Sequence, residues 1–327
     1  MQQRSLGKTG LKVSVIGLGC SRLGGLNAAG TRRKAATGLI NSAIDAGINL
    51  FDTADAYADG DAEALLGEAL GARRQHVVLC SKGGYLFQEH LGHSRRLQPV
   101  LHGLRRLREK ATRAPGRFST KSFEPGYLVR AVEHSLRRLK TDYIDLYQLH
   151  GASFREANDR GAIDALRGLK RAGKIRHFGV GLETLEDVED WLGLDGVGAI
   201  QLPFGLLDQA ALSLAFPAAR ASGAGVLVRS LFGGGWLTRQ GSKDELTSQT
   251  DSWRRILAYR EYAARNGIEL RSLALAFGLH DAVASSAIVG AHRPQQLQQL
   301  LALEPVALST ECIAYLKSVD RYAPLGR

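Results

Sequence analysis

Residues 127–149 read YLVRAVEHSLRRLKTDYIDLYQL, and they contain the two periodicities from which the fold can be inferred. In the first half, Leu128, Val132, Leu136 and Leu139 recur at intervals of three or four, which is the spacing of one apolar helix face. The second half is a short run rich in apolar and aromatic residues, which is typical of a buried strand. We therefore predict a helix over 127–139 and a strand over 143–149.

The same alternation continues along most of the chain. Eight apolar runs occur, at 13–18, 49–51, 77–80, 143–149, 177–180, 199–202, 225–228 and 286–289, and further helical spacing occurs at 33–46 and 163–172. Strands that alternate with helices predict a parallel sheet with right-handed crossovers, and eight units in roughly 300 residues fit a closed (β/α)8 TIM barrel. The rival is an open doubly wound sheet, but residues 17–25 read GLGCSRLGG instead of its GxGxxG signature.

Three additions to the barrel are predicted. Residues 3–13 form a hairpin that turns at 8–10, residues 230–252 form a glycine-rich loop, and residues 83–125 form a long insertion after the third strand. We expect the insertion to lie over the C-terminal face, which carries the chemistry in barrels of this type. Since no break in composition marks a second domain, we predict one barrel domain over 1–327.

Composition limits the class of protein. With 44% hydrophobic and 23% charged residues, the chain has an ordinary soluble globular composition, without an apolar run that could cross a membrane. The first ten residues lack the apolar segment of a secretory signal. The three cysteines, Cys20, Cys80 and Cys312, form no CxxC pair, so they favour a reducing compartment and argue against structural zinc. We therefore expect a cytoplasmic protein without a metal.

The net charge of +11 is concentrated in the insertion, where nine Lys and Arg residues outnumber three acids. This segment is either a solvated surface or a contact surface for an anionic substrate or partner. Its aromatic residues lie only at its edges, so no stacking platform for bases is visible, and we expect no nucleic-acid partner.

Four polar side chains follow three consecutive predicted strands. Asp52 ends the second strand in FDTADAY, with Tyr57 in the loop after it, while Lys82 and His150 end the third and fourth strands. Singly, each has an ordinary explanation as a loop cap, a packing residue, a surface lysine or a satisfied histidine. Because consecutive strands are neighbours in a barrel, we expect the four to converge on one pocket.

The chemistry of such a group is definite. A phenol loses its proton near pH ~10, and a neighbouring ammonium makes it a better acid. A carboxylate holds the ammonium in place, and an imidazole can donate a hydrogen bond to a carbonyl oxygen. Tyr57 is thus a candidate general acid for a carbonyl that becomes an alkoxide. No side chain supplies a hydride, so a nicotinamide cofactor is implied.

The sequence resembles the aldo-keto reductase superfamily, and in particular its bacterial, sugar-dehydrogenase-like branch, over nearly the whole chain. The motifs are RSLGKTGLKVSVIGLG (4–19), NLFDTADAY (49–57), SKGG (81–84), YIDLYQLH (143–150), GKIRHFGVG (173–181) and AIVGAHRPQQL (287–297). The resemblance implies that Tyr57 donates the proton, that Asp52 and Lys82 tune it, and that His150 positions the substrate carbonyl.

The resemblance also implies an extended NADP cofactor, with NAD as the alternative. It assigns cofactor contacts to Gly19, Cys20, Asp52, Gln201, Arg229, Ser230, Leu231, Gly233, Gly290, His292, Arg293 and Gln296. Gln201 is expected to hold the nicotinamide carboxamide, Arg229 to stack on the ring, and Arg293 to pair with a 2′-phosphate.

Several positions depart from the family pattern. Gly181 and Leu182 replace a Ser-Asn pair that contacts the carboxamide, Gln296 replaces a phosphate-binding arginine of some members, and Leu300 replaces a common asparagine. These changes leave the choice between NAD and NADP open. The substrate is expected to be an aldehyde, a ketone or a sugar-derived carbonyl. The alternative is a regulatory or binding subunit of the same fold that senses nicotinamide, and the oligomeric state is left open.

Overall fold

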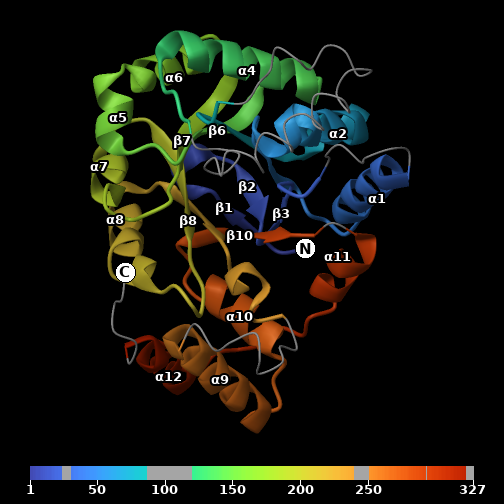
Figure 1. Ribbon diagram of the computed structural model, residues 1–327, viewed down its shortest axis with the longest axis vertical. Helices are drawn as coiled ribbons and strands as arrows, with labels where there is room; N and C mark the ends of the chain where they lie inside the picture. Colours follow the sequence, from blue (N-terminus) through green and yellow to red (C-terminus); the bar gives the residue numbers. More distant parts are fainter. Residues whose placement is uncertain (24–30, 87–119, 239–249, 292, 322–327) are drawn as a thin grey trace, which may run out of the picture. The chain divides into compact units, whose positions relative to one another are not determined.

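The computed structural model describes residues 1–23, 31–86, 120–238, 250–291 and 293–321 (Figure 1). Within these residues, eight strands form a closed barrel in the order β10-β3-β4-β5-β6-β7-β8-β9, which confirms the predicted (β/α)8 class. The barrel strands are β3 (Ile16–Gly19), β4 (Leu50–Asp52), β5 (Val78–Gly83), β6 (Ile144–His150), β7 (Ile175–Gly181), β8 (Val197–Pro203), β9 (Gly225–Arg229) and β10 (Ala284–Gly290).

Helices separate most of the barrel strands. They are α1 (Thr31–Asp45), α2 (Asp61–Leu70), α4 (Pro125–Leu139), α5 (Phe154–Asp159), α6 (Ala162–Arg171), α7 (Val188–Gly193), α8 (Ala215–Ser222), α9 (Thr250–Arg265), α10 (Leu270–Leu279), α11 (Pro294–Leu301) and α12 (Thr310–Arg321). The helices predicted at 33–46, 127–139 and 163–172 correspond to α1, α4 and α6. Helix α4 begins with Pro125 in its first turn, where the fixed φ of proline favours a helix, and it ends at the left-handed Lys140.

The predicted hairpin is present, but the first apolar run is divided between the hairpin and the barrel. Strands β1 (Gln3–Ser5) and β2 (Lys12–Ser14) pair antiparallel across the short helix η1 (Gly7–Thr9), and only β3 enters the barrel. The division falls at Val15, whose N–H donates to Gln2 and whose carbonyl accepts from Ala287 of β10. One residue therefore serves both sheets, and the predicted strand over 13–18 was too long at its start.

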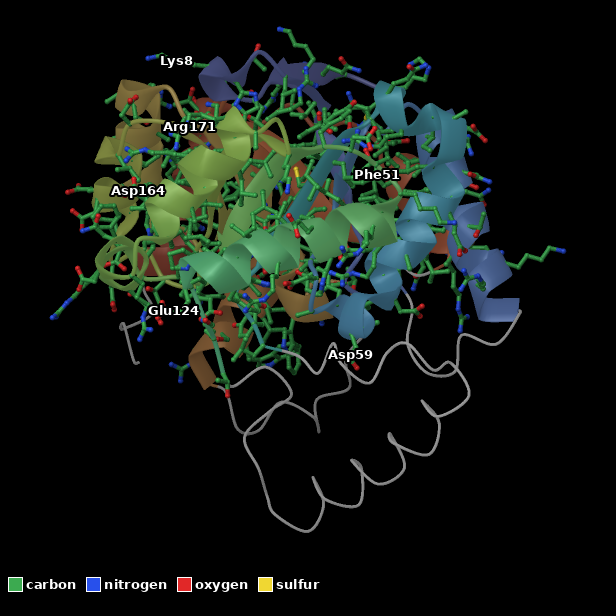
Figure 2. All side chains as sticks on the ribbon, turned by 90° about the horizontal axis from the view of Figure 1, so that it is seen from above. Lys8, Phe51, Asp59, Glu124, Asp164 and Arg171 are labelled. Atoms are coloured by element: carbon green, nitrogen blue, oxygen red, sulfur yellow. The ribbon has the colours of Figure 1, made fainter. Side chains whose placement is uncertain are left out.

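The chain divides into two compact units, which we describe separately. The first contains Met1–Gly17, Leu182–Val289 and Gln298–Arg327, and the second contains Leu18–Gly181 and Gly290–Leu297. In the second unit, helices α1, α2, α4 and α6 contact one another in chain order (Figure 1). Strand β4 is fully buried, and Phe51 lies in the interior (Figure 2).

The register of β4, β5, β6 and β7 in the second unit fixes the position of each candidate residue along its strand. Asp52 lies opposite Cys80, Lys82 opposite Gln148, and His150 opposite Gly181. These four strands pair in parallel, so the three residues lie toward the same ends of their strands, as predicted.

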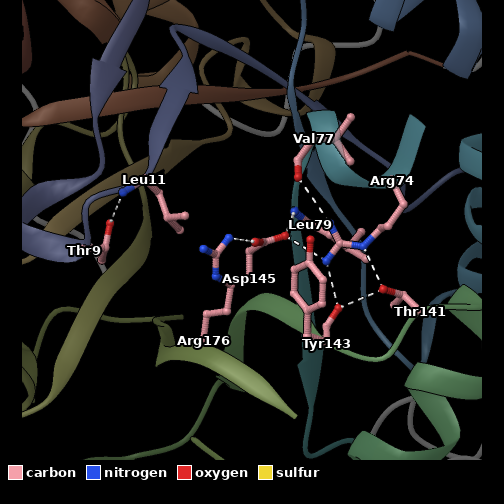
Figure 3. A network of polar contacts seen from close by, with 9 residues as sticks. All are labelled: Thr9, Leu11, Arg74, Val77, Leu79, Thr141, Tyr143, Asp145 and Arg176. Carbon is pink, nitrogen blue, oxygen red and sulfur yellow. Dashed lines mark hydrogen bonds and ion pairs between the residues drawn. The ribbon is translucent and has the colours of Figure 1, made fainter. Parts of the chain in front are cut away.

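A polar network joins β5, β6 and β7 near the ends at which these strands begin, away from the candidate residues (Figure 3). The buried carboxylate of Asp145 accepts from the backbone N–H of Leu79 at 2.9 Å and pairs with Arg74 at 2.9 Å and Arg176 at 3.0 Å. The Arg74 guanidinium also lies 4.2 Å from the centre of the Tyr143 ring. Networks at this face of a barrel support stability and not chemistry.

Most of the predicted insertion lies outside the described residues, which include only 83–86 and 120–125 of it. Its position over the C-terminal face stays a prediction, and the predicted 230–252 loop is described only at its two ends. In the part of the chain that the structure describes, no helix is long and apolar enough to cross a membrane.

Candidate active site

The centre of the candidate site is a buried ion pair between β4 and β5. The Lys82 Nζ atom lies 2.7 Å from each carboxylate oxygen of Asp52 and 3.0 Å from the carbonyl oxygen of Thr53. Lys82 is 1% exposed and Asp52 is 4% exposed. Burial alone lowers the pKa of Lys82, but the charge of Asp52, the neighbouring Tyr57 and the hydrogen bond to Asp52 outweigh it, so the pKa is raised. Lys82 is therefore an ammonium at neutral pH.

Tyr57 and His150 lie beside this pair. The Lys82 Nζ atom is 5.3 Å from the centre of the Tyr57 ring. The rings of Tyr57 and His150 are 5.8 Å apart and nearly perpendicular, at 82°. The four residues predicted to converge are thus brought together within the second unit, while their roles stay predictions.

The turn after Tyr57 has an unusual backbone. Ala58 (φ 52°, ψ 37°) and Asp59 (φ 55°, ψ 43°) are both left-handed, and Gly60 follows with φ 86° before α2 begins. A left-handed residue other than glycine costs roughly 1–2 kcal/mol. Figure 2 shows Asp59 and Glu124, the residue before α4, toward the same edge of this unit. The strained turn follows directly on the candidate proton donor, which is where such strain is often found.

The two glycines of SKGG are required by close neighbours. A Cβ atom on Gly83 would lie 2.0 Å from the Tyr147 hydroxyl oxygen, and one on Gly84 (φ 138°) would lie 2.4 Å from the Phe123 ring. A side chain at either position would force a shift of the neighbouring ring or of the segment that follows Lys82.

A short antiparallel ladder follows these glycines. We call Gly84–Leu86 and Thr120–Ser122 together the neck, because they border the part of the predicted insertion that lies outside the described residues. The N–H of Leu86 donates to Thr120 at 2.9 Å, and the N–H of Ser122 donates to Gly84 at 2.8 Å. The neck places the ring of Tyr85 4.7 Å from that of His150. The sequence predictions missed Tyr85; its only signal was its place three residues after Lys82.

The first unit holds five predicted cofactor residues at the ends of β8 and β9. Gln201 is buried in β8, and its carbonyl accepts from the N–H of Leu182 at 2.7 Å. The Leu182 carbonyl accepts from Arg229 Nη2 at 2.8 Å. Arg229 is thus hydrogen-bonded to Leu182, one of the two residues that depart from the expected Ser-Asn pair. The sequence did not reveal this contact.

After β9 the backbone turns tightly. Ser230 is left-handed (φ 65°), and its carbonyl accepts from the N–H of Gly233 (φ 55°) at 2.8 Å. Leu231, between them, is buried. A Cβ atom on Gly234 would meet no atom within 4 Å, so this loop offers open space beside its backbone.

The second unit holds the remaining predicted cofactor residues. Gly19 lies opposite Asp52, and the N–H of Cys20 donates to the Asp52 carbonyl at 2.8 Å. Burial, with the charge of Asp52, raises the pKa of the Cys20 thiol, so it remains protonated.

Gly290 ends β10, and a Cβ atom on it would meet nothing within 4 Å. Arg293 is exposed, and its carbonyl accepts from the N–H of Gln296. His292 lies outside the described residues. No group of residues suited to a metal ion occurs within the described ranges.

Comparisons with known proteins identify similar chains. A family model described as "Aldo/keto reductase family" matches residues 15–321. The chain is 32% identical over 209 residues to "Uncharacterized oxidoreductase YqkF" of Bacillus subtilis (strain 168), a match that covers 64% of this chain and spans only 58% of that relative. It is 28% identical over 330 residues to "Aldo-keto reductase YhdN" of the same organism, with 95% and 91% coverage.

Two further matches extend over nearly whole chains. The chain is 28% identical over 318 residues to "Pyridoxal 4-dehydrogenase" of Microbacterium luteolum, covering 91% of each protein. The holo form of aldo-keto reductase AKR11C1 from Bacillus halodurans superposes with a TM-score of 0.80 at 27% identity, covering 98% of this chain and 96% of that one.

Proposed function

The chain belongs to the aldo/keto reductase family, and from this membership we propose that it interconverts a carbonyl and an alcohol with NADP(H) as its cofactor. As a member of the family it is an oxidoreductase that acts on carbonyl groups. The observation that supports the proposal most is the buried Asp52–Lys82 pair beside Tyr57 and His150.

Tyr57 is proposed as the proton donor to the carbonyl oxygen. The buried ammonium of Lys82 stabilises the phenolate that is left when the proton has gone, and Asp52 keeps that ammonium charged. His150, against the Tyr57 ring, orients the carbonyl by donating a hydrogen bond to its oxygen. These charges are set in place before the reaction, in surroundings with little water, where they act most strongly.

The nicotinamide supplies the hydride when it is bound. Each unit by itself is compatible with such a group: open space lies beside the backbone of Gly234 in the first unit and of Gly290 in the second, as a backbone contact to a phosphate requires. The proposed contacts are Gly19, Cys20, Asp52, Gln201, Arg229, Ser230, Leu231, Gly233, Gly290, Arg293 and Gln296. The exposed guanidinium of Arg293 favours NADP, since it suits a 2′-phosphate.

The proposed substrate is a polar aldehyde, ketone or sugar-derived carbonyl, reduced in the main direction. One relative is named for a dehydrogenase reaction on pyridoxal, which places pyridoxal and its alcohol among the compounds to assay. Turnover of hydrophobic aldehydes alone would contradict the polar substrate class.

The test is the consumption of NADPH with a panel of aldehydes, ketones and sugars. We expect Tyr57→Phe to lose 10²- to 10⁴-fold in kcat, because general acid catalysis typically contributes about that much. The matched control is Tyr315→Phe on α12, whose ring stacks on Tyr262, and it should keep wild-type rates. If wild type and Tyr57→Phe are equally slow on every substrate while NADPH binds tightly, the chain is instead a nicotinamide-sensing binding subunit.

A further inference from the structure

The imidazole of His150 contacts two tyrosine rings. The centre of the Tyr57 ring lies 5.8 Å from that of His150 at an interplanar angle of 82°, and the centre of the Tyr85 ring lies 4.7 Å from it at 83°. Both contacts are edge-to-face, which is a favoured arrangement of aromatic pairs. We propose that Tyr85 is a positioning residue for His150, and that the neck holds Tyr85 in place for this purpose. The inference rests on the proposed function, in which His150 orients the carbonyl.

The backbone of His150 does not fix the direction of its ring. As the last residue of β6, His150 is held by its register opposite Gly181, and the next residue, Gly151, donates its N–H to the Gly181 carbonyl at 2.8 Å. These bonds fix the main chain but leave rotation about the side-chain bonds. Two perpendicular rings restrict that rotation, and Tyr85 is the nearer of the two.

Tyr85 is itself held at three points. Its backbone is paired with Lys121 in the neck, and its carbonyl accepts from the Tyr127 hydroxyl of α4 at 3.1 Å. Its ring lies 4.8 Å from the Lys121 Nζ atom, within the range of a cation–π contact. A ring fixed in this way can restrict the rotation of the His150 imidazole.

Lys121 connects the neck to the end of β6 directly. The same Nζ atom that lies against Tyr85 donates to the Gly151 carbonyl at 2.9 Å. One ammonium thus contacts both the positioning ring and the residue after His150. The second half of the neck, Thr120–Ser122, therefore helps to hold the site in place, although it is distant from His150 in the sequence.

The first experiment observes the His150 ring itself, without any need for turnover. Protein with 13C-labelled histidine rings gives one correlation signal per ring environment, and His150→Gln identifies the His150 signal. We expect Tyr85→Leu to shift and broaden that signal, because the ring current is lost and the imidazole samples more orientations. Tyr85→Phe, which keeps the ring, should restore it to near its wild-type place. Tyr315→Leu is the matched control, and it should leave the signal unchanged.

The second experiment separates positioning from substrate binding. We expect Tyr85→Leu to lower kcat by roughly tenfold with little change in KM, since a lost aromatic contact corresponds to about that factor. Lys121→Met should lower kcat by a smaller factor and move the His150 signal in the same direction. A His150 signal in folded Tyr85→Leu that matches wild type overturns the inference. If the His150 signal shifts in Tyr85→Leu but the wild-type protein reduces no carbonyl, the inference is supported and the proposed function is wrong.

Discussion

The Nζ atom of Lys82 lies 2.7 Å from each carboxylate oxygen of Asp52, and the carbonyl of Thr53 accepts from it at 3.0 Å. An ammonium has three N–H donors, so these three acceptors use all of them. Tyr57, whose ring centre is 5.3 Å from the same nitrogen, therefore experiences Lys82 as a fixed positive charge. The two partners of the pair are carried by the neighbouring strands β4 and β5.

Removing Lys82 should be strongly destabilising. Lys82→Met leaves the Asp52 carboxylate buried without its partner, which typically costs about 3–5 kcal/mol of the free energy of unfolding. Urea unfolding measures this loss. Arg167→Met, which breaks an exposed pair with Asp164, is the control and should cost less than about 1 kcal/mol. Equal losses in the two variants would contradict the prediction.

A side chain at Gly83 should collide with one hydroxyl group. We expect Gly83→Ala to lower the free energy of unfolding by about 1–3 kcal/mol, because its Cβ would lie 2.0 Å from the Tyr147 oxygen. Adding Tyr147→Phe removes that oxygen and should recover part of the loss. Gly38→Ala in α1, where a Cβ meets nothing within 4 Å, should stabilise by about 0.5–1 kcal/mol. Without recovery in the double variant, the proposed collision is wrong.

The two arginines on Asp145 should differ in importance. The side chain of Arg74 is 11% exposed and that of Arg176 is 55% exposed, so solvent screens the second pair far more than the first. Arg74 also donates to the carbonyls of Val77 and Tyr143. Arg74→Met should therefore lower the thermal midpoint clearly more than Arg176→Met. The reverse order in a calorimetric comparison would refute this ranking.

His177 should make stability depend on pH. Burial lowers its pKa, and the positive charges of Lys170 and Arg176 lower it further, against the weaker opposing effect of Asp145. A lowered pKa means that its contribution to stability is present above the unfolded pKa of about 6.5 and is lost as pH falls through the folded value. Urea unfolding between pH 8 and pH 5 should show a steeper loss for wild type than for His177→Gln. Parallel curves would show that His177 contributes nothing.

The barrel and its four central polar residues could be predicted because both follow from repetition. Eight alternating units imply one parallel barrel, and residues that end consecutive strands then share one rim, as Asp52, Lys82 and His150 do. The start of β3 could not be located, because the apolar run crosses from the hairpin into the barrel without a break, and only hydrogen bonds at Val15 divide it.

The contacts around the central residues could not be predicted from the sequence, for a different reason. Tyr85 and Lys121 meet across a long separation in the chain, and nothing in either segment indicates the other. Ala58 has no local preference for a left-handed backbone, so its conformation is imposed by the structure around it. The resemblance assigned Arg229 to the cofactor, but its bond is to the carbonyl of Leu182, which follows β7, a strand that is not next to β9 in the barrel order.

The neck also bears on how such a protein can diversify. Because Leu86 and Thr120 are already hydrogen-bonded to each other, any segment joined between them starts and finishes at two neighbouring points. The entropic cost of closing a loop grows only slowly with its length, so segments of many lengths could be exchanged there with little penalty to the barrel. The neck is therefore a natural grafting point, at which new recognition surfaces can be acquired while the barrel and its central ion pair are inherited intact.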